Sequence, residues 1–219
     1  MTIKKCMVGL VFAAAATSSQ AVTLLSAGFD DVSALSAAGW AQVNASTAPL
    51  GTPWFQGNTG VFGSFSGAAN SYIAANFLGT GSAAGSVSNW LMTPAIALDS
   101  TGLVTFRVQT SGDGLLDKIE VRLSINGAST NLADFSTLLG SFQGSTLTGW
   151  VAQSYALTAV VVPATGRIAF RYVVDDVSTA GNYLGVDSVL ITSAIPEPGT
   201  YALMALGVAG LLFRRRLST

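Results

Sequence analysis

Histidine is absent from this chain of 219 residues, and cysteine occurs only once, as Cys6. Without histidine, the chain cannot build a Ser-His-Asp or Cys-His nucleophile system or a His-ligated zinc site. One cysteine allows no internal disulfide. No Gly-rich phosphate loop of the common spacings opens a helix. These absences exclude the most familiar hydrolytic and nucleotide-dependent chemistries.

Charge is also scarce, at 10% of residues. Five of the ten basic residues lie close to the two ends of the chain. Between Val22 and Ile195, five basic residues stand against ten acidic ones, a formal charge of −5. An acidic surface repels phosphate backbones, so nucleic acid is not an expected partner.

The N-terminus has the features of a secretory signal peptide. Lys4 and Lys5 precede an apolar stretch over residues 6–16, and small residues follow, ending at Ala21. The apolar stretch is too short to span a bilayer. We therefore predict a signal helix within residues 1–21, removed by signal peptidase after Ala21. The alternative is a buried N-terminal helix.

The C-terminus has three parts. Pro196, Glu197 and Pro198 come first, and two prolines so close together favour an extended, exposed segment. Residues 201–213 follow and have no polar face. As a helix they would measure about 20 Å, less than the roughly 30 Å of a hydrocarbon core. Length alone would favour a buried or interfacial helix.

Three arginines change that interpretation. Arg214, Arg215 and Arg216 directly follow the hydrophobic segment, and they would hold this end on the cytoplasmic side of a membrane. The tail resembles the PEP-CTERM sorting signal, which combines a Pro-Glu-Pro motif, a hydrophobic helix and an Arg-rich end. The resemblance implies processing by an exosortase near the motif, in a Gram-negative producer of exopolysaccharide. A plain membrane anchor is the alternative.

The segment between the ends has the periodicity of β-strands. Residues 118–125 alternate aliphatic and polar side chains, which predicts one packed face and one wet face. Residues 104–109 and 167–172 alternate in the same way, and a last strand is expected near residues 185–192. Clusters of Gly, Asn, Ser and Pro separate these runs, as in all-β sandwiches and barrels. We expect only short helical turns, near residues 34–38 and 132–139, and a loop over residues 79–88.

Several short motifs occur in a characteristic order: Gly39-Trp40, then residues 53–58, 70–76, 88–94 and 166–172. This order resembles the choice-of-anchor J domain, a relative of the cleaved-adhesin and MAM-like jelly rolls. The resemblance implies a two-sheet jelly-roll sandwich and a family that occurs with several surface anchors, PEP-CTERM among them. It implies no particular ligand. The predicted organisation is a signal peptide at 1–21, a β-sandwich domain at 22–194 and a sorting tail at 195–219.

The acidic residues offer little for catalysis. A glycoside hydrolase needs two carboxylates, one of them protonated, and Glu120 is the only glutamate inside the domain. It lies between Lys118 and Arg122 on one strand face, where cations favour the ionised form. We predict a surface charge ladder here and a protein that is not an enzyme. Aspartate pairs are the remaining route to hydrolysis.

Calcium is the metal that this composition can bind, because it takes oxygen ligands. Asp30 and Asp31 lie near the start of the domain, and Asp187 lies in its last predicted strand. First and last strands are often neighbours in jelly rolls, and the resemblance to adhesin domains implies a calcium site in this area. We predict a structural calcium held by Asp30, Asp31 and Asp187. Simple turn formation by aspartate is the alternative.

The aromatic residues could serve as sugar platforms or as core. Trp40, Trp54, Phe55, Trp150 and Tyr183 are available, and core packing is the commoner role in a sandwich.

The sequence thus predicts a non-catalytic exported protein of the cell surface or extracellular matrix. It is held in the membrane by its C-terminal helix before processing, and it contributes to adhesion, biofilm or exopolysaccharide association. The alternative is a carbohydrate-binding module with a specific glycan ligand.

Overall fold

The computed structural model describes residues 21–145, 149–194 and 207. Residues Val22–Ser193 form one compact unit. The described residues form twelve β-strands and three short 3-10 turns. The strands are β1 (Ala21–Ala27), β2 (Ala41–Asn44), β3 (Phe55–Gln56), β4 (Ile73–Asn76), β5 (Val87–Met92), β6 (Ile96–Leu98), β7 (Leu103–Thr110), β8 (Asp117–Ser124), β9 (Thr137–Gly144), β10 (Val151–Ala156), β11 (Ala164–Val174) and β12 (Tyr183–Ala194). The turns are η1 (Val32–Ala34), η2 (Phe77–Gly79) and η3 (Leu132–Asp134).

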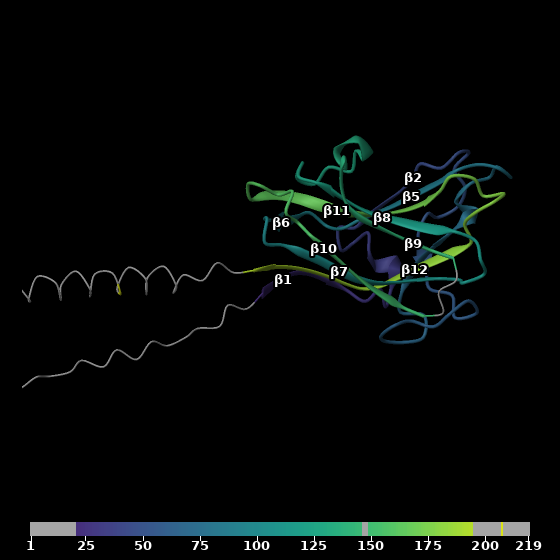
Figure 1. Cartoon of the computed structure of the whole chain (residues 1–219), viewed down its shortest axis with the longest axis horizontal. Helices are drawn as coiled ribbons and strands as arrows, with labels where there is room; N and C mark the ends of the chain where they lie inside the picture. The colour runs from purple at the N-terminus through teal and green to yellow at the C-terminus, as the bar shows by residue number, and fades with distance from the viewer. Residues whose placement is uncertain (1–20, 146–148, 195–206, 208–219) are drawn as a thin grey trace, which may run out of the picture. The chain divides into compact units, whose positions relative to one another are not determined.

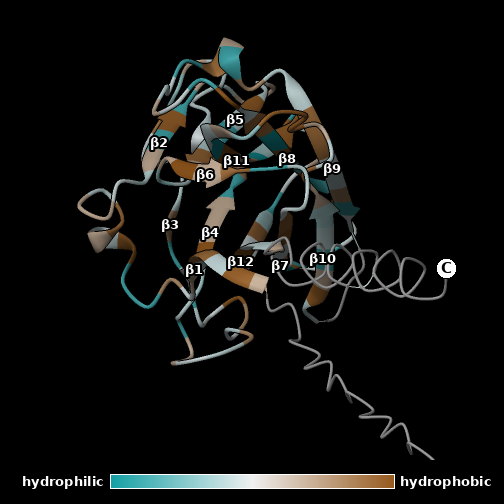
Figure 2. Cartoon of the chain, turned by 90° about the vertical axis from the view of Figure 1, so that its left-hand side faces the viewer, coloured by the Kyte–Doolittle hydropathy of each residue, from teal (hydrophilic) through white to brown (hydrophobic). Residues whose placement is uncertain are grey.

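The strands form two sheets that lie face to face as two layers (Figure 1). The first sheet has the order β10-β7-β12-β4-β3, and β1 also pairs with β12. The second has the order β2-β5-β11-β8-β9, and β6 also pairs with β11. The long pairings of β7 with β12 and of β8 with β11 are antiparallel. Figure 2 shows the two layers from another side. The predicted all-β, two-sheet sandwich is confirmed.

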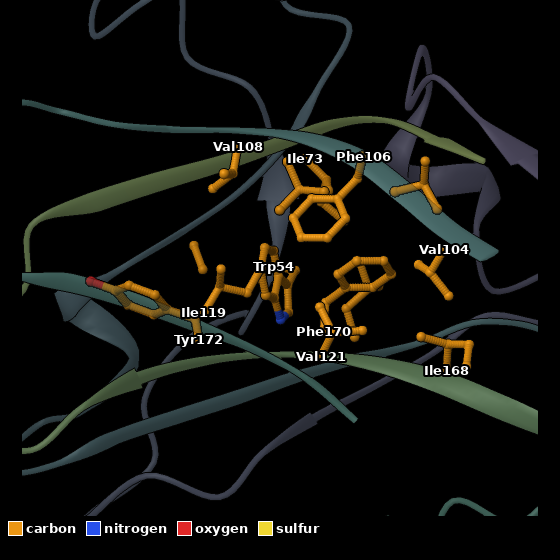
Figure 3. Packing of buried hydrophobic residues seen from close by; sticks show 14 of the residues in the cluster. Trp54, Ile73, Val104, Phe106, Val108, Ile119, Val121, Ile168, Phe170 and Tyr172 are labelled. Atoms are coloured by element: carbon orange, nitrogen blue, oxygen red, sulfur yellow. The ribbon is translucent and has the colours of Figure 1, made fainter. Parts of the chain in front are cut away.

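The core lies between the sheets and is built from alternate residues of β7, β8 and β11 (Figure 3). Phe106 of one sheet meets Phe170 of the other edge to face, with ring centroids 5.2 Å apart. The predicted alternation is confirmed in all three strands, whose inward residues are Val104, Phe106, Val108, Ile119, Val121, Leu123, Ile168, Phe170 and Tyr172. Trp54, from the segment before β3, is fully buried in the same core.

Two outer faces of the sandwich are covered in part by loops. An aromatic cluster under residues 57–71 covers the outer face of the first sheet, and a smaller cluster under η3 covers part of the second. The predicted wet face of residues 118–125 is therefore only partly wet, because Glu120 and Ser124 are buried. The expected inward position of Ile125 is wrong: β8 ends at Ser124, and Ile125 is 53% exposed in the turn that follows.

The expected helical turns are present but shorter. η1 covers Val32–Ala34, and the side chain of Asp31 caps its N-terminus by accepting a hydrogen bond from the Ser33 N–H. η3 covers only Leu132–Asp134. Residues 137–139 are not helical, because Thr137 pairs with Leu123 and begins β9.

The residues of the two predicted terminal helices lie outside the described residues, except Ala21 and Gly207. Ala21 opens β1, and Gly207 has helical backbone. Among the residues described, the structure contains no helix with the length and apolar character that a membrane crossing requires.

Candidate functional site on the outer face of the second sheet

Four basic side chains occupy the outer face of the second sheet. Ile119, Val121 and Leu123 of β8 and their counterparts on β11 point into the core, so their neighbours in sequence point outward. These neighbours include Lys118, Arg122, Arg167 and Arg171. Only one further basic residue, Arg107, lies between Val22 and Ile195, and it belongs to β7 of the other sheet. An acidic domain therefore carries nearly all its positive charge on one face.

Glu120 is the centre of this charge group. Its carboxylate lies 3.1 Å from Lys118 Nζ, 2.8 Å from Arg122 Nε and 3.2 Å from Arg171 Nη1. Arg171 comes from β11, where it is the direct register partner of Glu120. The predicted ladder of Lys118, Glu120 and Arg122 is confirmed, and β11 adds a third cation to it.

The electrostatics of Glu120 oppose acid catalysis. Burial raises the pKa of its carboxyl, but hydrogen bonds from Arg122 and Lys118 and the charges of Arg122 and Arg171 outweigh burial, so the pKa is lowered. A general acid must keep its proton near neutral pH. Glu120 is therefore ionised and suited to holding cations in place.

Beside this group, the surface contains a cavity of about 350 Å³. Trp90 of β5 and Arg171 line it, and the guanidinium carbon of Arg171 lies 5.0 Å from the centre of the Trp90 ring. Ser88 and Leu132 also contribute to the wall. An aromatic ring, a fixed cation and a hydroxyl around one hollow are typical of a small-molecule or sugar site.

Ser88 forms hydrogen bonds with both Trp90 and Arg171, the two main residues of the cavity wall. Its Oγ accepts a hydrogen bond of 3.0 Å from Trp90 Nε1 and one of 2.9 Å from Arg171 Nε. A serine hydroxyl has two acceptor sites and one donor, so these two bonds leave its O–H to donate to a ligand. Trp90 is 6% exposed and packs on Phe135, with centroids 6.0 Å apart. The wall is thus rigid before any ligand arrives.

Two of the three predicted calcium ligands, Asp30 and Asp187, approach one loop, and Asp31 forms a turn of its own. Asp31 is exposed and accepts hydrogen bonds from the backbone and hydroxyl of Ser33, which lower the pKa of its carboxyl. Asp30 and Asp187 approach one loop instead: a methyl group at Gly67 would lie 3.2 Å from Asp30 Oδ1, and Asp187 binds the preceding residues. Among the described residues, no three acidic side chains form a group that could hold a metal ion.

Asp187 is already saturated with hydrogen bonds. Its Oδ2 accepts from the N–H groups of Phe65 and Ser66, at 2.9 and 3.1 Å, and its Oδ1 accepts from the N–H and hydroxyl of Ser188. A carboxylate offers about four lone-pair sites, and these four bonds use them. The arrangement fits an anchor for residues 65–66, and a cation here would have to displace some of these bonds.

The aromatic candidates chiefly form core. Trp40 and Trp54 are buried between the sheets, and Tyr183 is buried in the cluster on the first sheet. Phe55 and Trp150 are half-buried in that same cluster, where Trp150 Nε1 donates to the Gly63 carbonyl. Core packing is confirmed for the three buried rings. Trp90, the aromatic wall of the cavity, was not among the sequence candidates.

The sorting residues Pro196, Glu197, Pro198, Arg214, Arg215 and Arg216 lie outside the described residues. The sequence itself matches the PEP-CTERM protein-sorting motif over residues 194–216. The chain therefore carries this motif, which indicates an exported protein sorted by an exosortase and anchored at its C-terminus before processing. A search of curated proteins finds no match.

Solved structures show where the sandwich belongs among known folds. It is similar to the K1 cleaved adhesin domain of Lys-gingipain from Porphyromonas gingivalis W83, with 21% identity and a TM-score of 0.55, over 78% of this chain and 98% of the other. The K3 domain of the same protein gives 20% identity and a TM-score of 0.52, over 80% and 99%. At this identity the similarity establishes an adhesin-like fold, as the resemblance to choice-of-anchor J domains implied.

Proposed function

We propose that this chain is a non-catalytic surface or matrix protein whose β-sandwich associates with extracellular polysaccharide and contributes to adhesion or biofilm. The observation that carries the proposal is the PEP-CTERM motif at residues 194–216, directly after the last strand of an adhesin-like sandwich. A sorting tail delivers its passenger domain outside the cell. Glu120, the glutamate of the domain, is ionised among cations, and this state suits binding better than acid catalysis.

The charge group supports a binding role. Glu120 holds three cations in fixed positions and keeps its own carboxylate ionised. Such an arrangement orders a recognition surface, whereas hydrolysis of a glycosidic bond would need a protonated partner carboxyl.

A carbohydrate-binding module with a defined glycan ligand is the second candidate. The cavity beside Trp90 favours it, because the cavity combines apolar wall residues with the hydrogen-bonding groups of Ser88, Arg171 and Asp175, which can orient the hydroxyls of one sugar ring. The two candidates share a location outside the cell and differ in whether one glycan is selected.

Mass spectrometry of the protein from its producing bacterium tests the proposal. We expect a mature chain that begins at Val22, ends near Pro198 and is found outside the cytoplasm. Replacing Glu197 with Ala should leave the tail unprocessed, while Glu120→Gln, a carboxylate change inside the domain, should not affect processing. An intact chain from Met1 to Thr219 in the cytoplasm would overturn the proposal.

A further inference from the structure

We propose that the cavity beside Trp90 binds a carboxylated sugar residue of an acidic polysaccharide, with Arg171 as the partner of the sugar carboxylate. This inference rests on the proposed function and names the chemical class of its ligand. It is carried by the position of Arg171, the aromatic wall and the unequal distribution of charge over the domain.

The charge distribution selects an anion. On β8 and β11 the outer face carries the partly exposed cations Lys118, Arg122 and Arg171 against Glu120, and Asp175 adds one carboxylate to the cavity lining, while the domain as a whole has a charge of −5. A local excess of cations on an acidic protein attracts a polyanion to that face and repels it elsewhere. The attraction should weaken with salt, since exposed charges are screened over about 10 Å at 0.1 M ionic strength.

Two hydrogen bonds hold the guanidinium of Arg171 in place and leave further N–H donors for a ligand. A guanidinium has five N–H donors, and Arg171 employs Nε on Ser88 and one Nη1 donor on Glu120. The remaining donors can form the paired bonds that a planar carboxylate accepts from arginine. The ring of Trp90 supports the guanidinium from one side. The planar guanidinium of Arg171 is therefore oriented before binding, which lowers the entropic cost of binding the carboxylate.

The rest of the lining suits a sugar ring. Trp90 and Leu132 provide apolar surface, and Ser86, Ser88 and Asp175 provide polar groups. Asp175 can accept hydrogen bonds from sugar hydroxyls, and the free O–H of Ser88 can donate one. The volume of about 350 Å³ is at the lower end of small-ligand sites, so one sugar unit of a longer chain would enter.

The test compares two forms of one polymer. Calorimetry of the processed protein with polygalacturonate and with its fully methyl-esterified form changes only the charge of the ligand. We expect binding to polygalacturonate that is at least tenfold tighter than to the ester and that weakens as salt is raised. Arg171→Gln should lose at least tenfold in affinity, whereas Arg107→Gln, on the opposite sheet, should bind like the wild type.

The fold of Arg171→Gln is checked by its melting curve, and Arg171→Lys, which keeps the charge but lacks the planar guanidinium, provides a second variant that should also lose affinity. Equal binding of both polymers would overturn the charged-sugar inference and leave a neutral glycan role standing. Binding of dextran sulfate that equals polygalacturonate and falls alike in both arginine variants would also overturn it, as unspecific attraction. Failure to bind any polymer would overturn it too, while correct processing at Val22 and Pro198 would still uphold the exported surface role.

Discussion

Tyr172 donates its hydroxyl proton to Oδ1 of Asp117 across 2.5 Å, and neither side chain has exposed surface. The N–H of Asn182 donates to the same oxygen at 2.9 Å. Among the described residues, Oδ2 of Asp117 has no partner. Burial raises the pKa of Asp117 more than these hydrogen bonds lower it. The fold therefore holds the pKa of this carboxyl above its ordinary value.

The first prediction concerns pH. Because the folded pKa of Asp117 lies above the ordinary value of 3.8, the folded state binds more protons between the two values, and stability falls as pH rises through that window. Asp117→Asn should remove this loss, so its stability relative to the wild type should increase with pH. Urea unfolding from pH 2 to 7.5 measures the difference.

Asp176→Asn is the matched control for that experiment. Hydrogen bonds from Ser178 lower the pKa of Asp176, so its contribution is present above the ordinary value and is lost as pH falls. The two variants should show opposite slopes against pH. Parallel slopes would contradict the roles assigned to both carboxyls.

The second prediction concerns two glycines of one loop. A methyl group at Gly57 would lie 2.2 Å from the ring of Tyr72, whose hydroxyl is held by bonds to the Asn58 and Phe62 carbonyls. Gly57→Ala should therefore cost about 1–3 kcal/mol of unfolding free energy. At Gly63 the nearest atom is 3.9 Å away, so Gly63→Ala should change stability by less than about 0.5 kcal/mol. Equal losses in urea unfolding would show that the loop is not fixed by Tyr72.

The third prediction concerns Trp54. The side chain is fully buried, and its Nε1 has no hydrogen-bond partner among the described residues. Trp54→Ala should cost about 3–5 kcal/mol through the cavity it leaves. Trp54→Phe should cost about 1–2 kcal/mol, because it keeps much of the apolar contact and removes an unsatisfied donor. If both variants lose the same stability in urea, the indole N–H makes a bond that the fold depends on.

The fourth prediction tests calcium. If Asp30 and Asp187 hold the ion together, millimolar calcium should raise the melting temperature by several degrees, and EDTA should reverse the rise. Asp30→Asn should abolish this response. Asp187→Asn should lower the melting temperature even without calcium, since it weakens the anchor of Phe65 and Ser66. An unchanged melting temperature in calcium would leave Asp187 as a loop anchor alone.

The sequence was sufficient to predict the sandwich wherever only one face of a strand is buried. In β8 the alternation of Ile119, Val121 and Leu123 with polar residues identifies the inward side directly. β5 gives no such signal, because all six of its residues are buried. The direction of Trp90, and with it the wall of the cavity, could not be derived from periodicity.

The site was harder to predict because it joins distant segments. Arg171 was readable as an outward residue of its strand, but its pairing with Glu120, 51 positions away, depends on the register between β8 and β11. Asp187 likewise binds residues 65–66, more than 120 positions earlier, next to an irregularity in the pairing of β12 with β7. No local pattern encodes such registers.

The placement of β12 determines how the domain responds to mechanical force. This strand ends at Ala194, where the sorting motif begins, and it is paired with β7, with β1 and, over Tyr183–Val186, with β4. A pull on the C-terminus therefore acts on an interior strand, whose pairing with β7 extends from Leu184 to Thr192. In the surface role proposed above, we expect a domain tethered through an interior strand to resist shear better than one attached through a strand at the margin of its sheet.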